Sequence, residues 1–215
     1  MNKILIFTSL MLTAAHPALA QDLVVYGGAS LGFDIEPDGA GSDNATSLSA
    51  YIELEKGSLY GGLSGTVKND SASNEVDVYA GYRDERDSGL SYGVVYTRYL
   101  YPNDSASNFG ELGLSLGQTL GEKAAVSLDV YYDHTNKLAS AYVGAEFYAT
   151  DTITLSANYG VYENDGAPNE QEWDLGVTYG LSDEAAVDLR YFDGSDYTDG
   201  YFGLELSFDT TILGG

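Results

Sequence analysis

The sequence contains no cysteine, little proline, few basic residues and no long apolar run in its main part. Without cysteine the chain has neither disulfide bonds nor thiolate metal ligands. The prolines after the first twenty residues are Pro37, Pro102 and Pro168, and all three are expected in loops. Nowhere beyond those first residues does the chain offer the ~20 consecutive apolar positions that a membrane-spanning helix needs. These absences favour a chain of many short strands.

Positive charge is scarce, with 9 Lys and Arg against 33 Asp and Glu. One of the nine, Lys3, lies in the first twenty residues, which hold no acidic residue. The rest of the chain therefore carries eight basic and 33 acidic side chains, a net charge of −25. This charge excludes nucleic acid as a partner, because its phosphates would be repelled. Cations remain candidate partners.

The first twenty residues have the pattern of a cleaved signal peptide. Lys3 precedes an apolar segment at residues 4–15, and small residues at Ala18 and Ala20 follow it. We expect cleavage after Ala20 and export into the periplasm. Residues 21–215 then form one all-β domain.

Apolar and polar residues alternate along most of this domain. Leu48, Ile52 and Leu54 fall on one side of a strand at residues 47–55, while Glu53 falls on the other. The alternation predicts about twelve strands. Further segments with this pattern, some of them rich in glycine, are residues 23–33, 59–67, 75–83, 90–101, 111–116, 126–133, 140–147, 153–161, 172–179, 187–192 and 202–208.

The expected connections alternate between long and short. This arrangement predicts a single antiparallel transmembrane β-barrel in the bacterial outer membrane, with both termini in the periplasm. A barrel is required because lipid cannot satisfy the backbone groups of an open sheet edge. The long connections are expected at 36–44, 69–73, 102–107, 134–136, 163–168 and 194–198, and the short ones at 56–57, 86–88, 119–122, 150–151 and 182–183.

One segment does not fit the alternation cleanly. Residues 90–101 place Arg98 on the same side as Leu90, Tyr92 and Val94, the apolar side. Either a bulge near Tyr96 or an arginine that extends its head to the membrane surface would account for this.

The order of several motifs resembles that of a known family. EVDVYAGY at residues 75–82 is followed by LSYGVVY at 90–96, YLYP at 99–102 and NFGE at 108–111. In this respect the chain resembles the TorF-like porins, a family of small bacterial outer-membrane β-barrel proteins. The likeness covers roughly residues 75–117. It implies the same barrel fold and a porin-like function.

If the apolar face contacts lipid, the polar face lines the lumen. Rings of acidic side chains favour cations, so one interpretation is a narrow, cation-leaning diffusion channel for small solutes. The alternative is a closed-lumen structural or surface-interaction barrel, because about twelve strands enclose less space than the 16–18 of wide porins. The candidate lining residues are Glu53, Glu75, Asp77, Arg83, Glu111, Asp129, Glu146, Glu172, Asp174, Asp188, Arg190 and Glu205.

Aromatic residues near strand ends are candidates for the girdles where lipid meets water. They would contact outer-membrane lipid and lipopolysaccharide. These residues are Tyr82, Tyr132, Tyr159, Trp173, Tyr179, Tyr191 and Phe208.

Other sites are weakly indicated. Acidic loops at residues 34–43 and 193–199 lack the spacing of a dedicated calcium loop, and we expect them to bind divalent cations only loosely. His134 stands alone beside Asp133, so the sequence predicts no enzyme and no cofactor. A secreted soluble β-sandwich remains an alternative, because it would also show alternation.

Overall fold

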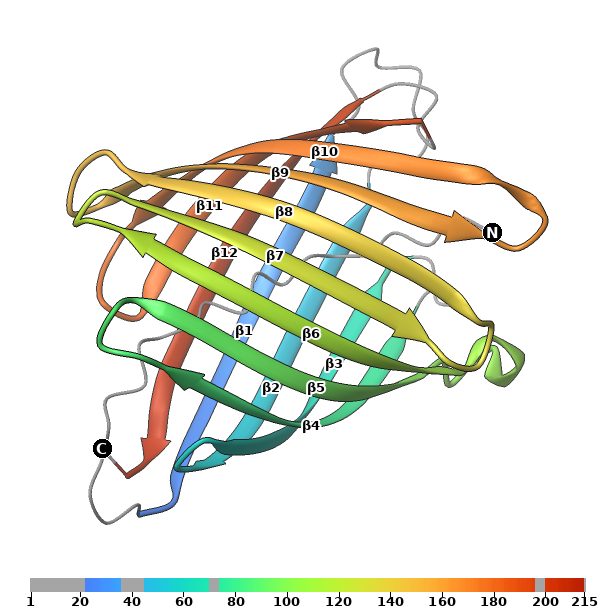
Figure 1. Ribbon diagram of the computed structural model, residues 1–215, viewed down its shortest axis with the longest axis horizontal. Coiled ribbons are helices and arrows are strands. Elements are labelled where there is room, and N and C mark those ends of the chain that lie inside the picture. Colours follow the sequence, from blue (N-terminus) through green and yellow to red (C-terminus); the bar gives the residue numbers. More distant parts are fainter. Residues whose placement is uncertain (1–21, 36–44, 70–73, 196–199, 215) are drawn as a thin grey trace.

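The computed structural model describes residues 22–35, 45–69, 74–195 and 200–214. They form a closed antiparallel barrel (Figure 1). A one-turn 3-10 helix, η2 (Ser105–Ser107), lies between β5 and β6, and none of the described residues forms a helix that could span a membrane. The strands are β1 (Val24–Ile35), β2 (Thr46–Lys56), β3 (Leu59–Lys68), β4 (Glu75–Glu85), β5 (Leu90–Leu100), β6 (Phe109–Leu120), β7 (Ala124–Asp133), β8 (Leu138–Tyr148), β9 (Ile153–Asn164), β10 (Ala167–Gly180), β11 (Ala185–Gly194) and β12 (Tyr201–Leu213).

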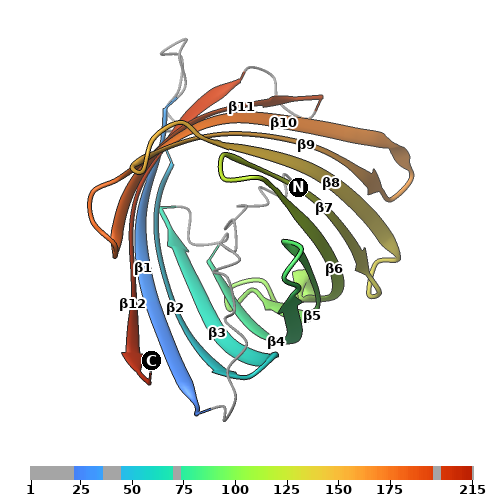
Figure 2. The same ribbon diagram turned by 60° about the vertical axis from the view of Figure 1, so that its left-hand side comes forward.

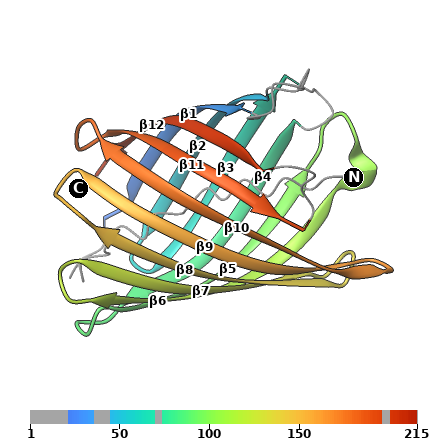
Figure 3. The same cartoon turned by 90° about the horizontal axis from the view of Figure 1, so that it is seen from above.

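The ring closes where β1 pairs with both β2 and β12. Ala29 lies opposite Ala50 on one side and Phe208 on the other, and Figure 2 shows β12 beside β1. All other strands pair with their neighbours in sequence; Figure 3 shows β7 to β10 running side by side. Because the barrel is closed, no sheet edge exposes unpaired backbone N–H and C=O groups to lipid, which could not bond them. The prediction of a single barrel of about twelve strands is confirmed.

The two ends of the barrel differ. Because the strand number is even, β1 begins and β12 ends at the same end, which also carries short turns (Figure 1). In outer-membrane barrels that end faces the periplasm, and it is called the periplasmic end below. Its turns are residues 57–58, 86–89, 121–123, 149–152 and 181–184, while the connections at the outer end are residues 36–45, 69–74, 101–108, 134–137, 165–166 and 195–200.

One expected long loop is a tight hairpin instead. The prediction of a long connection at 163–168 is wrong, because β9 and β10 are joined by Asp165 and Gly166 alone, and Gly166 has a positive φ of 73°. An Asp-Gly pair suits such a two-residue turn. Pro168 is therefore in a strand rather than a loop. It lies at the register shift between Ala167 and Glu170, where a missing N–H is tolerated.

The two faces of the wall are chemically distinct. Large apolar side chains such as Leu48, Leu114 and Leu175 are more than half exposed and share one face. On the other face, side chains touch partners two strands away: Tyr51 of β2 donates to Asp209 of β12 at 2.8 Å, past β1. Contacts that skip a strand form on the concave side, where side chains converge. The polar face is therefore the inside.

Arg98 lies on the outer face without a bulge. The pairing of β5 with β4 and with β6 runs without a register shift past Arg98, which lies opposite Val78 and Gly110. The regular register excludes the first of the two sequence interpretations. Arg98 is the third residue from the outer end of β5, close enough to that end for its long side chain to reach the membrane surface.

Candidate functional site

The inside of the barrel holds all the residues predicted to line a lumen. Glu53 and Asp174 are each 5% exposed and Glu111 is 9% exposed, whereas Glu146 remains exposed. The other candidates, Glu75, Asp77, Arg83, Asp129, Glu172, Asp188, Arg190 and Glu205, occupy inward positions of intermediate exposure.

Arg83 is held between two carboxylates of β2. Its Nη2 donates to Glu53 Oε1 at 2.7 Å, and its Nε donates to Glu55 Oε2 at 3.1 Å. The guanidinium lies over the ring of Tyr60, 4.4 Å from the ring centre. These contacts cross β3, because the three acidic and basic side chains come from β4 and β2. They tie three strands together near the periplasmic end.

Arg190 makes a second cluster of the same kind. Its Nε donates to Asp188 Oδ1 at 3.2 Å, and it also pairs with Asp174 of β10. Its Nη2 reaches past β10 to Ser156 Oγ of β9 at 2.9 Å. Gly176 permits this reach: a Cβ there would lie 2.5 Å from Arg190 Nη2 and 2.8 Å from Ser156 Oγ. Each arginine thus stands against two carboxylates.

The inward positions of β5 to β9 differ from those of the strands that carry Arg83 and Arg190, because these five described strands place no Lys or Arg inward. We call this inner surface the arginine-free wall, and the inner surface of β10–β12 and β1–β4 the arginine wall. Glu111, Asp129 and Glu146 project from the arginine-free wall, and Tyr99 Oη donates to Glu111 Oε1 at 3.3 Å. This half of the lumen has negative charge and hydroxyls without an inward cation of its own.

Inward tyrosines lie along the wall and cover glycines of neighbouring strands. Each of these glycines is a position where an added Cβ would meet the tyrosine ring. The rings therefore fill space next to the backbone, not space at the barrel axis. The pairs are Tyr51 with Gly28, Tyr79 with Gly62, Tyr60 with Gly81, Tyr131 with Gly113 and Tyr142 with Gly160.

The described residues form no conventional packed core inside the barrel. Among the described residues no side chain is less than 2% exposed, and only Tyr60 and Tyr142 are buried hydrophobic residues. A filled barrel would bury a layer of interlocking apolar side chains. The described interior instead consists of polar side chains held against the wall.

Aromatic residues gather at the outer end of the inner surface. The rings of Tyr99 and Phe109 stack with centres 4.4 Å apart, and those of Phe192 and Tyr201 stack at 4.8 Å. Tyr101, in the connection after β5, stacks more loosely on Phe109 at 6.4 Å. Burial, together with a hydrogen bond to Glu75, raises the pKa of Tyr101, so its hydroxyl stays protonated.

The predicted girdle residues all face outward. Tyr132, Tyr159, Tyr179 and Phe208 are between 43% and 49% exposed. Trp173 packs near Tyr191, with ring centres 5.6 Å apart. Tyr82 and Tyr179 are near the periplasmic end and Tyr132 and Tyr191 near the outer end, whereas Tyr159 and Phe208 lie nearer the middle of their strands. Their role at the membrane surface stays a prediction.

The remaining candidates form no catalytic or metal arrangement within the described part of the chain. His134 stacks on Tyr96, and its Nε2 is 3.1 Å from the Tyr96 hydroxyl. The described residues contain no group of three or more His, Cys, Asp or Glu placed to hold a metal ion. Most of the predicted acidic loop residues, including Asp38, Asp43, Asp196 and Asp199, lie outside the described residues, as does the predicted signal peptide.

The inward tyrosines belong to the site but are not among the residues predicted to line the lumen. Tyr60, Tyr131 and Tyr142 each fall on the polar side of a strand, and that position is the sequence signal for them. Tyrosine suits both the membrane surface and a polar interior, so its residue type alone does not indicate the face.

Together the closed barrel, the apolar outer face and the polar inner face define a transmembrane β-barrel. Searches found no matching family model and no matching curated protein. Solved structures do match. The KdgM porin superposes with a TM-score of 0.66 at 12% identity, covering 84% of this chain and 98% of that one; KdgM has also been solved in complex with disordered oligogalacturonate.

Two further matches extend the comparison. The NanC porin has a TM-score of 0.60 at 12% identity, covering 87% of this chain and 100% of that one. The outer membrane phospholipase A of Escherichia coli has a TM-score of 0.55 at 11% identity, covering 89% of this chain and 91% of that one. The chain therefore has the fold of bacterial outer-membrane barrels, which is consistent with the predicted localisation in that membrane. Its resemblance to the TorF-like porins stays a prediction.

Proposed function

We propose that this chain is a narrow diffusion channel of the outer membrane that favours small cations over anions. The arginine-free wall is the observation that carries the proposal. Glu111 and Asp129 face the lumen there from strands that place no Lys or Arg inward. Acidic side chains along a water-filled passage attract cations and repel anions.

The arrangement of the inward side chains supports an open passage. The rings of Tyr131 and Tyr142 lie over Gly113 and Gly160, so they occupy the wall and leave the axis. The absence of any described side chain below 2% exposure supports the same interpretation. A closed-lumen barrel would instead need inward side chains packed against one another across the axis.

The charge of the lumen also bears on the solute. Oligogalacturonate, found with KdgM, is a chain of negatively charged sugar acids. An acid-rich lumen would repel such a chain, so we infer that this channel passes small cations and small neutral solutes instead. Lipid and lipopolysaccharide surround the barrel, and its acidic outer loops would bind divalent cations loosely.

Planar bilayer recordings test the proposal. The mature barrel is purified, its folding is checked by heat-modifiable migration, and it is inserted under an about tenfold KCl gradient. We expect discrete current steps and a reversal potential with the sign of cation selectivity. A folded barrel that gives no current at any voltage would favour the closed-lumen alternative, and an anion-selective reversal potential would contradict the proposed role of the acidic wall.

A further inference from the structure

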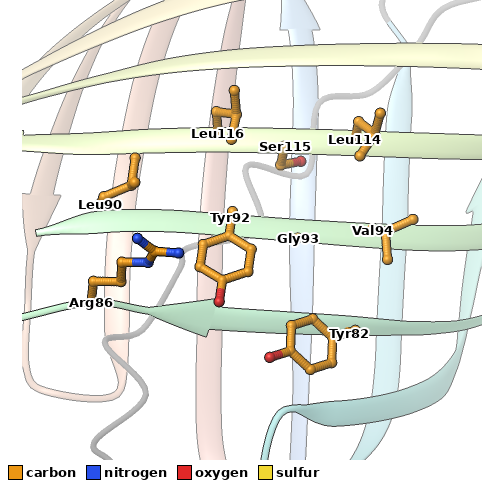
Figure 4. Close-up of a pocket in the computed structure, with 9 residues that line it drawn as sticks. All are labelled: Tyr82, Arg86, Leu90, Tyr92, Gly93, Val94, Leu114, Ser115 and Leu116. Carbon is orange, nitrogen blue, oxygen red and sulfur yellow. The ribbon is translucent and has the colours of Figure 1, made fainter.

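The outer face of β4, β5 and β6 carries a groove at its periplasmic end. The groove has a volume of about 480 Å³, which falls in the range of about 300–1,000 Å³ typical of ligand pockets. Figure 4 shows Tyr92 at its centre, Tyr82 and Arg86 on one side, and Leu114 and Leu116 on the other. Because this face contacts the membrane, the ligand to consider is a lipid.

The strand register orders the groove by depth. Tyr82 lies opposite Val94, which lies opposite Leu114 on β6. Asp84 lies opposite Tyr92 in the next row towards the periplasmic end, and Arg86 follows in the turn. Four residues of strand at ~3.3 Å each and a ~45° tilt put Tyr82 about 9 Å deeper in the membrane than Arg86.

Two opposite charges lie at the shallow end: Arg86 lines the groove, and Asp84 lies next to it, bonded to two of the tyrosines that line it. The guanidinium of Arg86 lies 5.7 Å from the centre of the Tyr92 ring, and among the described contacts it has no carboxylate partner. Asp84 Oδ2 accepts hydrogen bonds from Tyr82 at 3.1 Å and Tyr92 at 3.3 Å, which fixes the carboxylate on the outer face. The groove therefore has a cation in its lining and an anion fixed against two of its tyrosines, next to the aliphatic side chains of Leu114 and Leu116.

We propose that this groove binds one phospholipid with a zwitterionic, primary-amine head group from the periplasmic leaflet. The phosphate pairs with Arg86, the ammonium pairs with Asp84, and an acyl chain lies along Val94, Leu114 and Leu116. The charges of the head group fit those of the protein. A lipid whose head group carries only a phosphate would pair with Arg86, but its negative charge would then lie near the carboxylate of Asp84 with no ammonium to pair with it. The groove lies at the end where β1 begins and β12 ends, so the lipid belongs to the leaflet that contains phospholipid.

Native mass spectrometry of the folded mature barrel in detergent tests this binding. The purified protein is stripped of lipid and titrated with phosphatidylethanolamine, phosphatidylglycerol or lipid A. We expect one tightly retained phosphatidylethanolamine. R86Q should weaken its retention about tenfold, the value expected for loss of one charge-assisted hydrogen bond, and D84N should remove the preference over phosphatidylglycerol.

Two further variants make the result decisive. Leu114→Trp fills the trough and should abolish retention, and it lies on the exposed outer face, where folding tolerates it. Lys123→Gln removes an exposed cation from the neighbouring turn, outside the groove, and should change nothing. Equal retention by wild type, R86Q and L114W would overturn the proposal. A preference for lipid A would also overturn the proposal. A loss of lipid retention in L114W but not in R86Q would do the same, because Arg86 would then not bind the head group.

Discussion

The arginine wall and the arginine-free wall of the lumen share one sequence pattern but differ in charge balance. Both place acidic residues at alternate positions of their strands. On the arginine wall, Arg83 and Arg190 each hold two carboxylates, and each also bonds a strand that is not its neighbour, Arg83 through these carboxylates and Arg190 through Ser156. On the arginine-free wall, Glu111 and Asp129 face the lumen beside tyrosines. We infer that one half supports the barrel and that, in the proposed channel, the other half sets the selectivity.

The largest expected effect is a loss of stability on the arginine wall. Arg190→Ala leaves Asp174, which is 5% exposed, beside Asp188 with no cation between them. Removing one partner of a buried ion pair costs about 3 kcal/mol. Urea unfolding in detergent, followed by tryptophan fluorescence, measures the loss. Arg190→Gln combined with Asp174→Asn should recover most of it, and an unchanged unfolding midpoint in the single variant would contradict a structural role.

The second effect concerns the tyrosines of the arginine-free wall. Gly160→Ala introduces a Cβ into the space of the Tyr142 ring, which must move away from the wall. We expect a lower single-channel conductance and a destabilisation of about 1–3 kcal/mol, as for overpacking elsewhere. Gly65→Ala, on the outer face of β3, controls for the change from glycine to alanine in a strand, since its Cβ would meet nothing closer than 3.8 Å. If both variants conduct like the wild type, the ring does not limit the passage.

Much of the fold could be predicted because a strand has a period of two. Alternation placed Leu114 outside and Glu111 inside without knowledge of any partner strand. The hairpin at Asp165 and Gly166 was missed because the surrounding polar residues resembled a loop, although an Asp-Gly pair is a turn signal. Arg98 could not be assigned because its position depends on the pairing of β5 with both neighbours.

The site was less predictable than the fold. Its inward residues follow from alternation, but the division into two walls does not. The contact of Arg190 with Ser156 depends on β10 lying between them and on Gly176 leaving room. Tyr79 and Tyr82 lie three residues apart on one strand and face opposite sides, so the position in the alternation, and not the residue type, separates a lumen tyrosine from a membrane tyrosine.

A third prediction tests selectivity on the arginine-free wall. Glu111→Gln removes one inward charge. At about 6 Å from a passing ion in an aqueous lumen, such a charge stabilises a cation and destabilises an anion by about 0.7 kcal/mol each, roughly a tenfold change in the ratio of cation to anion permeability. Reversal potentials in a KCl gradient measure this ratio, and adding Asp129→Asn should lower it further. An unchanged ratio in the double variant would mean that selectivity arises elsewhere in the channel.

The smallest expected effect comes from removing an ion pair as a unit. Arg83→Gln together with Glu53→Gln leaves the net charge of the arginine wall unchanged, because one cation and one anion are lost. The permeability ratio should stay within about 1.2-fold of the wild-type value, since the field at the axis depends on the net charge. The double variant should be destabilised less than Arg83→Gln alone, because Glu53 no longer stays buried as a charge without its cation, although Glu55 loses its partner. Arg83→Gln alone is the comparison for the double variant. It makes the lumen more negative by one charge, so it should raise the cation preference and destabilise the barrel. If the double variant shifts selectivity as far as Glu111→Gln does, both walls contribute to ion selection, and the proposed assignment of selectivity to the arginine-free wall is wrong.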